Sequence, residues 1–316
     1  MKRRKFIKYF STAAGGLIIP GLFFRDSEII AGEKNESTPH KPNPADWKSS
    51  DINIAWIGHS TVLINLFGTI ILTDPVLFQR VGLYAFGITI GPSRYSNPAL
   101  SADEIPRPDI ILLSHAHMDH MDYESLLFLS KKFPGEIECI TAYNTADVIQ
   151  ELEWKSLQEV DWTQEILLQN IRFKAIEVNH FGWRYPWERD RSKGYFENGR
   201  SYNAYIIEKN GKKILFGGDT AYSDKFIKSF EEGIEIAIMP IGAYQPWKRN
   251  HCNPEEALMM ASKHLKAKYF VPIHCNTFKQ GSEPIEEPIN WMITAAENFD
   301  IKIGIKEIGQ TFTTAV

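Results

Sequence analysis

Residues 110–120 read Ile-Ile-Leu-Leu-Ser-His-Ala-His-Met-Asp-His, an apolar run followed at once by three histidines and an aspartate. Four apolar residues in a row are typical of a buried β-strand. As the chain leaves a strand, alternate side chains point the same way, so His115 and His117 can reach one ion. Asp119 and His120 can turn toward a second site as the next helix begins. These polar groups would be costly to satisfy without a metal, so the segment predicts a metal centre.

Three more candidate ligands also follow predicted strands or loops, although each alone would be a weak signal. They are His180 after residues 173–179, Asp219 after residues 214–216, and His274 after residues 269–273. The glycines of the Gly-Gly-Asp-Thr run allow the backbone to pass close to a site. Together with the first four residues, these side chains supply the nitrogen and oxygen ligands that two zinc-like ions require. Iron or manganese would suit the same ligands.

The rest of the chain mixes short strands with helices. Strands are predicted at residues 52–56, 62–67, 69–73, 110–113, 213–216, 234–241 and 269–273. One helix is predicted at residues 123–131. A second begins after Asn253, a good N-cap that is followed by proline and two glutamates. Strands early in the chain, and strands mixed with helices later, indicate layered sheets flanked by helices.

Composition excludes some classes of protein. The chain has 316 residues, of which 43% are hydrophobic and 23% charged, and a net charge of −4, as in ordinary globular domains. No basic stripe is visible after residue 50, which argues against nucleic-acid binding. The chain has three cysteines, and an odd number argues against a disulfide framework. A single disulfide between Cys252 and Cys275 is left open.

The N-terminus predicts export. Arg3 and Arg4 stand in a basic start that precedes an apolar stretch at residues 11–24. That stretch is shorter than the about 20 residues of a membrane span, and the Arg-Arg-Lys-Phe-Ile-Lys run resembles a twin-arginine signal. We therefore expect a signal at residues 1–31, a linker at 32–50 and one metal-binding domain at 51–316. The expected location is the periplasm or cell envelope, with or without membrane association.

The ligand pattern, His-x-His-x-Asp-His followed by a histidine, an aspartate and a final histidine, resembles the metallo-β-lactamase fold superfamily. The resemblance covers residues 52–310. It implies an α/β fold, a four-layer αββα sandwich with the metal site at the edge of both sheets. It also implies how the ligands divide: His115, His117 and His180 on one ion, Asp119, His120 and His274 on the other, with Asp219 bridging.

Several stretches are most similar to the N-acyl phosphatidylethanolamine phospholipase D branch of that superfamily. They are WIGHST (56–61), LTDPVL (72–77), residues 91–122, GGDTAY (217–222), MPIGAYQPWKRNHCNPEEAL (239–258) and IHCNTF (273–278). The branch implies a phosphodiesterase that releases N-acylethanolamine and phosphatidic acid. Asp119 would be catalytic, and His251 would donate a proton or contact substrate. His59 and Tyr244 would contact substrate, and Asp74 would order a turn or support a metal-binding histidine.

Other interpretations stay open. A lactone or β-lactam hydrolase would use the same activated water, and a diiron centre would serve oxygen chemistry. The aromatic segment 180–203 matches the branch only loosely, and it either lines a lipid-accepting cleft or forms a structural cluster. Residues 81–90 fit a loop that contacts a membrane or a buried segment, and we expect burial. The expected partner is a phospholipid or another phosphodiester, with peripheral membrane contact as an option and the oligomeric state undetermined.

Overall fold

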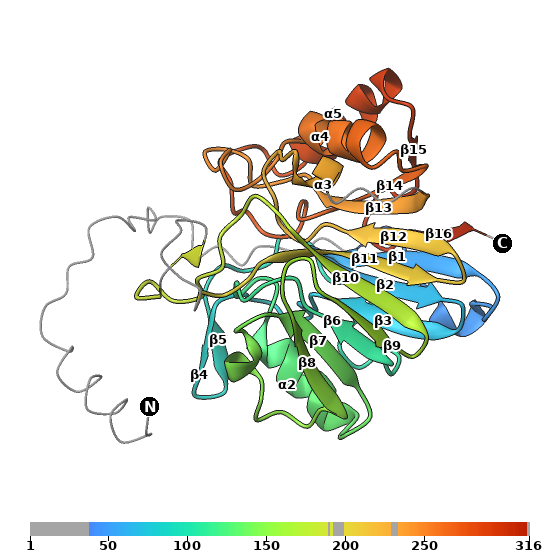
Figure 1. Cartoon of the computed structure of the whole chain (residues 1–316). Helices are drawn as coiled ribbons and strands as arrows, with labels where there is room; N and C mark the ends of the chain where they lie inside the picture. Colours follow the sequence, from blue (N-terminus) through green and yellow to red (C-terminus); the bar gives the residue numbers. More distant parts are fainter. Residues whose placement is uncertain (1–37, 189, 192–198, 229–232, 315–316) are drawn as a thin grey trace, which may run out of the picture. The chain divides into compact units, whose positions relative to one another are not determined.

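The computed structural model describes residues 38–188, 190–191, 199–228 and 233–314 (Figure 1). The predicted export signal lies outside these residues. Asn35–Val316 forms one compact unit. The described part of the predicted linker belongs to that unit: His40 Nε2 lies 2.7 Å from Glu307 Oε2, and Trp47 packs against a core cluster. None of the helices in the described ranges is both long and apolar enough to cross a bilayer.

The first of two seven-stranded sheets has the order β16-β1-β2-β3-β6-β7-β8. Its strands are β1 (Ile52–Gly58), β2 (Thr61–Leu66), β3 (Thr69–Thr73), β6 (Ile110–Leu112), β7 (Glu138–Ala142), β8 (Ser156–Val160) and β16 (Thr311–Thr314). Strands β1 to β3 form an antiparallel meander, whereas β3, β6, β7 and β8 run parallel. Parallel neighbours need a crossover connection, and α2 (Tyr123–Lys132) lies in the one between β6 and β7.

The second sheet has the order β15-β14-β13-β12-β11-β10-β9. Its strands are β9 (Glu165–Leu168), β10 (Ile171–Glu177), β11 (Asn203–Lys209), β12 (Lys212–Phe216), β13 (Ile234–Pro240), β14 (Tyr269–Ile273) and β15 (Lys302–Ile303). The longer helical segments beside it are α3 (Lys225–Lys228), α4 (Pro254–Met259), η4 (Met260–His264) and α5 (Glu287–Ala295). Short turns of helix are η1 (Pro44–Asp46), η2 (Ala146–Val148) and η5 (Ala296–Asn298).

Alternation along β1 shows how the layers stack. Ile54 and Trp56 face a core cluster shared with the second sheet, whereas Ala55 and Ile57 face a cluster shared with α2. The first sheet is therefore buried on both faces. Figure 1 shows α2 outside the first sheet and α4 and α5 outside the second. The predicted αββα sandwich is confirmed.

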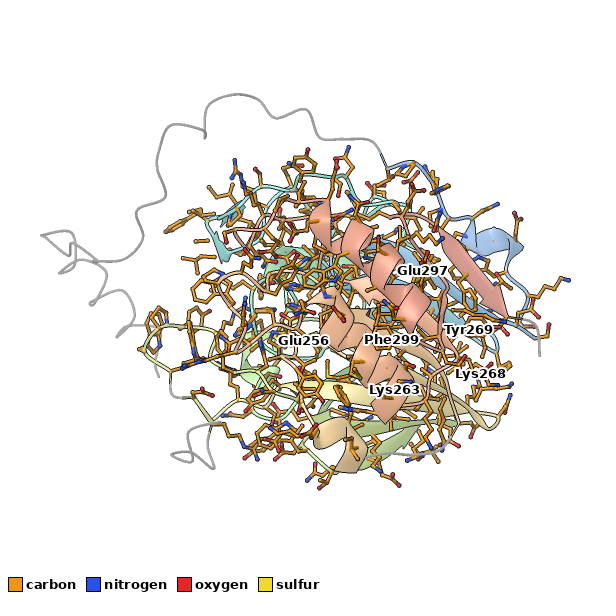
Figure 2. All side chains as sticks on the ribbon, turned by 90° about the horizontal axis from the view of Figure 1, so that it is seen from above. Glu256, Lys263, Lys268, Tyr269, Glu297 and Phe299 are labelled. Carbon is orange, nitrogen blue, oxygen red and sulfur yellow. The ribbon has the colours of Figure 1, made fainter. Side chains whose placement is uncertain are left out.

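The predicted helix after Asn253 is α4. Asn253 Oδ1 accepts a hydrogen bond from the backbone N–H of Glu256 at 2.9 Å, and the Glu256 carboxylate accepts one from the Asn253 N–H. These two bonds form a capping box that fixes where the helix begins. Figure 2 looks onto α4 and α5 where they cover the second sheet, with Glu256 labelled. Cys252 directly precedes this cap and, like Cys275, is buried and unpaired.

The expected burial of residues 81–90 is wrong. They form a separate two-stranded hairpin of β4 (Leu83–Ala85) and β5 (Ile88–Ile90), which pair only with each other. At its tip the Phe86 side chain is 99% exposed, and Ile88 is 60% exposed. The expectation failed because two short strands have no second layer to cover an apolar face. Val81, just before the hairpin, is buried.

The topology also explains where the polar residues meet. Strands β12, β13 and β14 are parallel, so their carboxyl ends reach the same edge of the second sheet. In open sheets of parallel strands, ligands bind beyond these carboxyl ends. The carboxyl end of β6 brings residues 114–120 to that edge from the first sheet, because Asn203 N at the start of β11 donates to Ser114 O at 2.9 Å.

Candidate metal centre

All seven predicted ligands converge at the shared edge of the two sheets. Four follow β6, and one each follows β10, β12 and β14: His115, His117, Asp119, His120, His180, Asp219 and His274. Most of these side chains are buried, and Asp119 is the most accessible carboxylate, at 15%. A cluster of five imidazoles and two carboxylates contributed by separate strands is thus assembled by the fold itself.

Three imidazole nitrogens face a common point on one side of the cluster. His115 Nε2 lies 2.8 Å from His117 Nδ1, which lies 3.2 Å from His180 Nε2. Nitrogen ligands about 2.0–2.1 Å from a tetrahedral zinc are roughly 3.3 Å apart. The three nitrogens are therefore spaced much as the ligands of one ion would be.

Asp219 connects this group to the second one. Its Oδ2 atom lies 3.1 Å from both His120 Nε2 and His274 Nε2, and 3.8 Å from His180 Nε2. Asp119 Oδ2 completes the second group, at 3.3 Å from His274 Nε2 and 3.5 Å from His120 Nε2. One carboxylate oxygen thus faces ligands of both groups, which is the position that a bridging aspartate occupies.

Buried polar atoms without hydrogen-bond partners indicate that these residues fit a metal. His120 Nε2, His251 Nδ1 and Asp219 Oδ1 are buried and have no hydrogen-bond partner among the described residues. A buried polar atom without a partner costs about 1–3 kcal/mol, so several in one cluster indicate that something else satisfies them. Imidazole and carboxylate donors suit a divalent cation such as zinc, iron or manganese. The cluster is able to bind metal ions.

The charges of the cluster divide into two kinds. Burial lowers the pKa of His180 to about 3 and that of His117 to about 4, so both are neutral and ready to bind a cation. Burial also opposes the charged form of His274, but Asp219 and Asp119 outweigh it and raise its pKa to about 9. For Asp219, burial is outweighed by His120 and His274, and its pKa falls well below its ordinary value. Protons on His120 and His274 therefore balance the charge of the aspartates until a metal cation replaces those protons.

Asp74 supports two of the ligands from behind. Its Oδ2 atom accepts hydrogen bonds from His120 Nδ1 at 2.7 Å and Ser114 Oγ at 2.5 Å, and its Oδ1 atom accepts one from Ser114 N. Ser114 Oγ in turn lies 2.9 Å from His115 Nδ1. These bonds direct the Nε2 atoms of both histidines into the cluster. Asp74 thus lies behind a candidate metal-binding histidine, in the position that the sequence predicted for it.

The backbone near the cluster is unusually constrained. A Cβ on Gly218, whose φ is +56°, would lie 2.7 Å from Ser114 Cβ and 2.8 Å from Asn203 O. The predicted need for a small residue before Asp219 is therefore confirmed. His59 and His274 also have positive φ, 50° and 60°. Such residues are held by their surroundings and gather at functional sites.

Four hydrogen bonds around the cluster were not apparent from the sequence. Arg184 Nη1 donates to Ala116 O at 2.8 Å and Met121 O at 2.9 Å, so it spans the loop that carries His117, Asp119 and His120. Gln280 Nε2 donates to Asp119 Oδ2 at 2.6 Å. His180 Nδ1 lies 2.9 Å from Asn250 O. Arg184 belongs to the loosely matched aromatic segment, and no local motif marks these residues.

The other predicted residues occupy different positions. His59 is 1% exposed and its Nε2 lies 3.1 Å from Asp119 Oδ2, so it sits behind that aspartate and could itself share an ion with it. His251 belongs to the cluster, with Nδ1 3.7 Å from Asp219 Oδ2. The Tyr244 hydroxyl bonds to α5, since it donates to Glu287 Oε1 at 2.6 Å.

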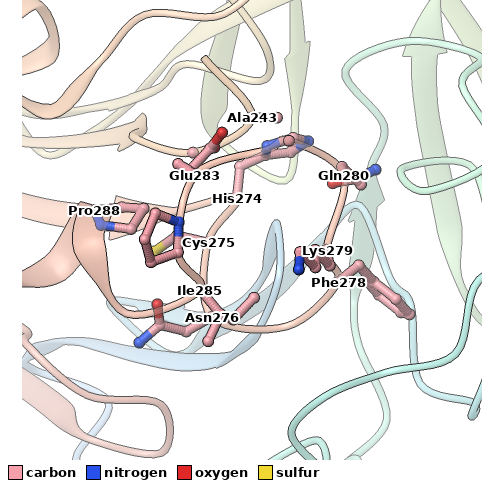
Figure 3. A pocket seen from close by; sticks show the side chains of 13 residues that line it. Ala243, His274, Cys275, Asn276, Phe278, Lys279, Gln280, Glu283, Ile285 and Pro288 are labelled. Carbon is pink, nitrogen blue, oxygen red and sulfur yellow. The ribbon is translucent and has the colours of Figure 1, made fainter. Parts of the chain in front are cut away.

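The surroundings of the cluster differ on two sides. Figure 3 shows the loop after β14, where a cavity of about 20 Å³ beside His274 is lined by Phe278 and Gln280. That volume suits a water molecule and no lipid. On the other side, the Phe181 ring lies 4.4 Å from the His117 ring and 4.9 Å from that of Trp183. Phe181 and Trp183, at the start of the aromatic segment, therefore lie beside the cluster.

Replacing Asp74 with alanine should weaken metal binding by about 10–100-fold, because His120 loses the partner that fixes its orientation. Competition with a chromophoric chelator measures this affinity. Asp46→Ala, which removes an exposed aspartate of η1, is the matched control and should bind metal as the parent does. Equal affinities for the two variants would contradict the supporting role of Asp74.

Metal binding should release protons at pH 7. The raised pKa values of His120 and His274 mean that both carry protons in the metal-free cluster, whereas a ligand must be neutral. Apparent affinity should therefore rise with pH up to about 9, the pKa of His274. Calorimetric titration with zinc in buffers of different ionisation enthalpy counts the protons. Zinc uptake without proton release at pH 7 would contradict this charge assignment.

Comparison with known proteins agrees with this geometry. Residues 69–275 match the family model described as beta-lactamase superfamily domain. The N-acyl-phosphatidylethanolamine-hydrolyzing phospholipase D of Saccharomyces cerevisiae is 31% identical over 272 residues, which cover 81% of this chain and 54% of the yeast protein. N-acyl-phosphatidylethanolamine-hydrolyzing phospholipase D 1 of Caenorhabditis elegans is 27% identical over 253 residues, covering 74% and 66% of the two chains.

A solved structure shares the fold. The metallo hydrolase Igni18 of Ignicoccus hospitalis superposes with a TM-score of 0.62 at 18% identity, covering 84% of this chain and 99% of its own. The family match, the two sheets with their outer helices and the cluster of histidines and aspartates agree with one another. The chain therefore belongs to the beta-lactamase superfamily, as a metal-dependent hydrolase with the metallo-β-lactamase fold.

Proposed function

We propose that this protein is a phosphodiesterase of the phospholipase D type that hydrolyses N-acyl phosphatidylethanolamine to N-acylethanolamine and phosphatidic acid. The observation that carries the proposal is the position of the cluster against an aromatic wall, with Phe181 and Trp183 beside His117. Residues that could bind a phosphoryl group thus lie next to aromatic side chains that could contact an acyl chain. The yeast and nematode relatives, whose names specify this reaction, support the same choice.

The cluster would hold two ions, which we propose to be zinc. His115, His117 and His180 would bind one, Asp119, His120 and His274 the other, and Asp219 would contact both. Divalent cations in such a site supply Lewis-acid chemistry, since they activate water for attack and neutralise charge that builds on phosphoryl oxygens. The chain's own contribution is to keep the two groups of ligands close together and largely shielded from solvent.

Asp119 is the carboxylate best placed to act on water. Its Oδ2 atom faces His59 and His274 and accepts a hydrogen bond from Gln280, while its side chain keeps 15% exposure. The pKa of Asp119 is well below its ordinary value, because His120 and His274 outweigh the effect of burial. A charged, oriented and partly accessible carboxylate can accept a hydrogen bond from the attacking water and so orient it for attack.

His251 is placed to serve the leaving group. Its side chain is 12% exposed, its Nδ1 atom has no hydrogen-bond partner among the described residues, and its ring lies 5.1 Å from that of His274. Burial lowers its pKa to about 3, so it is neutral in the free protein. An anionic phosphodiester beside it would raise that pKa. His251 could then take up a proton and deliver it to the departing oxygen.

The test of the proposed function is hydrolysis of N-acyl phosphatidylethanolamine by protein of measured metal content. Release of N-acylethanolamine and phosphatidic acid is expected, and it should be lost in the Asp119→Ala, His120→Ala variant because both residues would hold the same ion. Mass spectrometry of the products distinguishes cleavage on either side of the phosphorus. The exposed-histidine variant His40→Ala controls for the loss of an imidazole and should keep full activity.

The outcomes separate the competing functions. Two bound metals without release of N-acylethanolamine would remove the lipid assignment and leave the hydrolase. Turnover of lactones or nitrocefin would then indicate a carbonyl centre as the target. Iron in the purified protein, together with oxygen consumption, would indicate a diiron centre in place of a zinc hydrolase.

His251→Ala should lower kcat on this lipid by about 100-fold or more, with metal content unchanged, because a proton donor contributes at least that much. The loss should shrink on a diester whose leaving group is p-nitrophenol, since that group departs without protonation. A loss of equal size on both substrates would show that His251 does not protonate the leaving oxygen.

A further inference from the structure

The β4–β5 hairpin presents apolar side chains to solvent. Phe86 is 99% exposed, Ile88 60%, Ile90 58% and Leu83 44%. Figure 1 shows β4 and β5 standing outside both large sheets. Single exposed apolar residues are common, but a contiguous group on one projecting element usually marks a contact surface.

Side-chain contacts hold the hairpin against the start of α2, close to the metal cluster. The Tyr84 ring lies 5.3 Å from that of Tyr123, and Thr89 donates a hydrogen bond to Glu124. These partners form the first turn of α2, which begins three residues after His120. At the base, a Cβ on Gly82 would lie 2.1 Å from Ile90 O, so the two strands cross too closely for a side chain there.

The tip uses a residue that the turn itself disfavours. Phe86 and Gly87 have φ of 54° and 84°, the left-handed pair of a two-residue hairpin turn. Asparagine or aspartate normally takes the first of these positions, because a bulky side chain is strained at positive φ. Phe86 recovers nothing by packing, since its side chain is almost fully exposed. An apolar ring held in this way favours a contact outside the chain.

Two other exposed aromatic side chains lie in loops that also carry residues of the cluster. Trp187, 74% exposed, stacks on Tyr185 in the segment that carries His180 and Arg184. Trp247, 51% exposed, lies four residues before His251, whose backbone N–H donates to its carbonyl at 3.0 Å. Lys248 and Arg249 follow it and are also exposed. Three segments thus expose apolar side chains: the β4–β5 hairpin, which contacts the start of α2, and the loops of Trp187 and Trp247. The Trp247 loop also carries two basic side chains.

We propose that Phe86 and its hairpin, together with Trp187 and Trp247, form a docking surface for an anionic phospholipid bilayer. Aromatic rings on separate projections suit the fluid interface of a bilayer, where tryptophan and phenylalanine insert at headgroup level. Lys248 and Arg249 match the negative charge of that surface. This inference rests on the proposed function, and N-acylation itself removes the ammonium charge of ethanolamine, so the substrate headgroup is anionic.

The direct test places an environment-sensitive fluorophore at residue 86. The native cysteines are buried, so a thiol-reactive dye attached to Phe86→Cys labels the tip selectively. With vesicles of equal parts phosphatidylcholine and phosphatidylglycerol, emission should rise roughly threefold and be quenched by lipids that carry a nitroxide in the acyl chain. Leu167→Cys is the matched control, because Leu167 is also highly exposed, at 73%, but lies on β9.

Both labelled proteins keep the same N-terminal segment, so a difference between them reports the labelled position alone. An equal response at residues 86 and 167, or none at residue 86, would overturn the docking surface. Replacing Lys248 and Arg249 with glutamine should weaken binding to these vesicles far more than binding to pure phosphatidylcholine. An equal effect on the two kinds of vesicle would overturn the electrostatic part.

A kinetic comparison separates this inference from the proposed function. Phe86→Ser should lower turnover of N-acyl phosphatidylethanolamine in vesicles by about tenfold relative to turnover of a soluble short-chain analogue, the effect of withdrawing one phenyl ring from lipid. Leu167→Ser should leave that ratio unchanged. If the parent cleaves neither substrate but residue 86 enters the bilayer, the proposed function fails and the docking surface stands. If cleavage proceeds and residue 86 stays in water, the reverse holds.

Discussion

The fold is arranged around one electrostatic constraint, the burial of two aspartates and five histidines at one edge of a sandwich. Asp219 Oδ2 lies 3.1 Å from two imidazole nitrogens, and several neighbouring polar atoms have no partner among the described residues. Such a cluster is stable only when protons or cations balance the carboxylates. The positive φ of His59 and His274 and the glycine before Asp219 can be understood as consequences, since each lets the backbone bring a donor to this point.

Parallel strands make that convergence possible. The carboxyl ends of β12, β13 and β14 share an edge, and the carboxyl end of β6 meets it from the other sheet. The core clusters on the two faces of β1 hold the sheets and helices together. The strands thereby fix where each ligand-bearing loop begins. The αββα sandwich therefore determines which residues can act together, while the surrounding loops determine what they act on.

The sequence predicted most strongly what is local. His115, His117, Asp119 and His120 stand within six positions, and the capping residues of α4 are three positions apart, so both patterns carry their own geometry. Arg184 and Gln280 were missed because their partners lie 63 to 68 and 161 positions away. The hairpin was misjudged because apolar residues were expected inside, whereas this element has no layer above it. The direction of the Tyr244 hydroxyl depends on α5, which no nearby residue reveals.

Asp74 links the two halves of the cluster, since it holds His120 directly and His115 through Ser114. The first histidine belongs to one group of ligands and the second to the other. An ion that orients His120 would also orient Asp74 and Ser114, which in turn position His115. The two sites are for this reason expected to fill cooperatively, so that half-loaded protein is scarce and metals exchange as a pair.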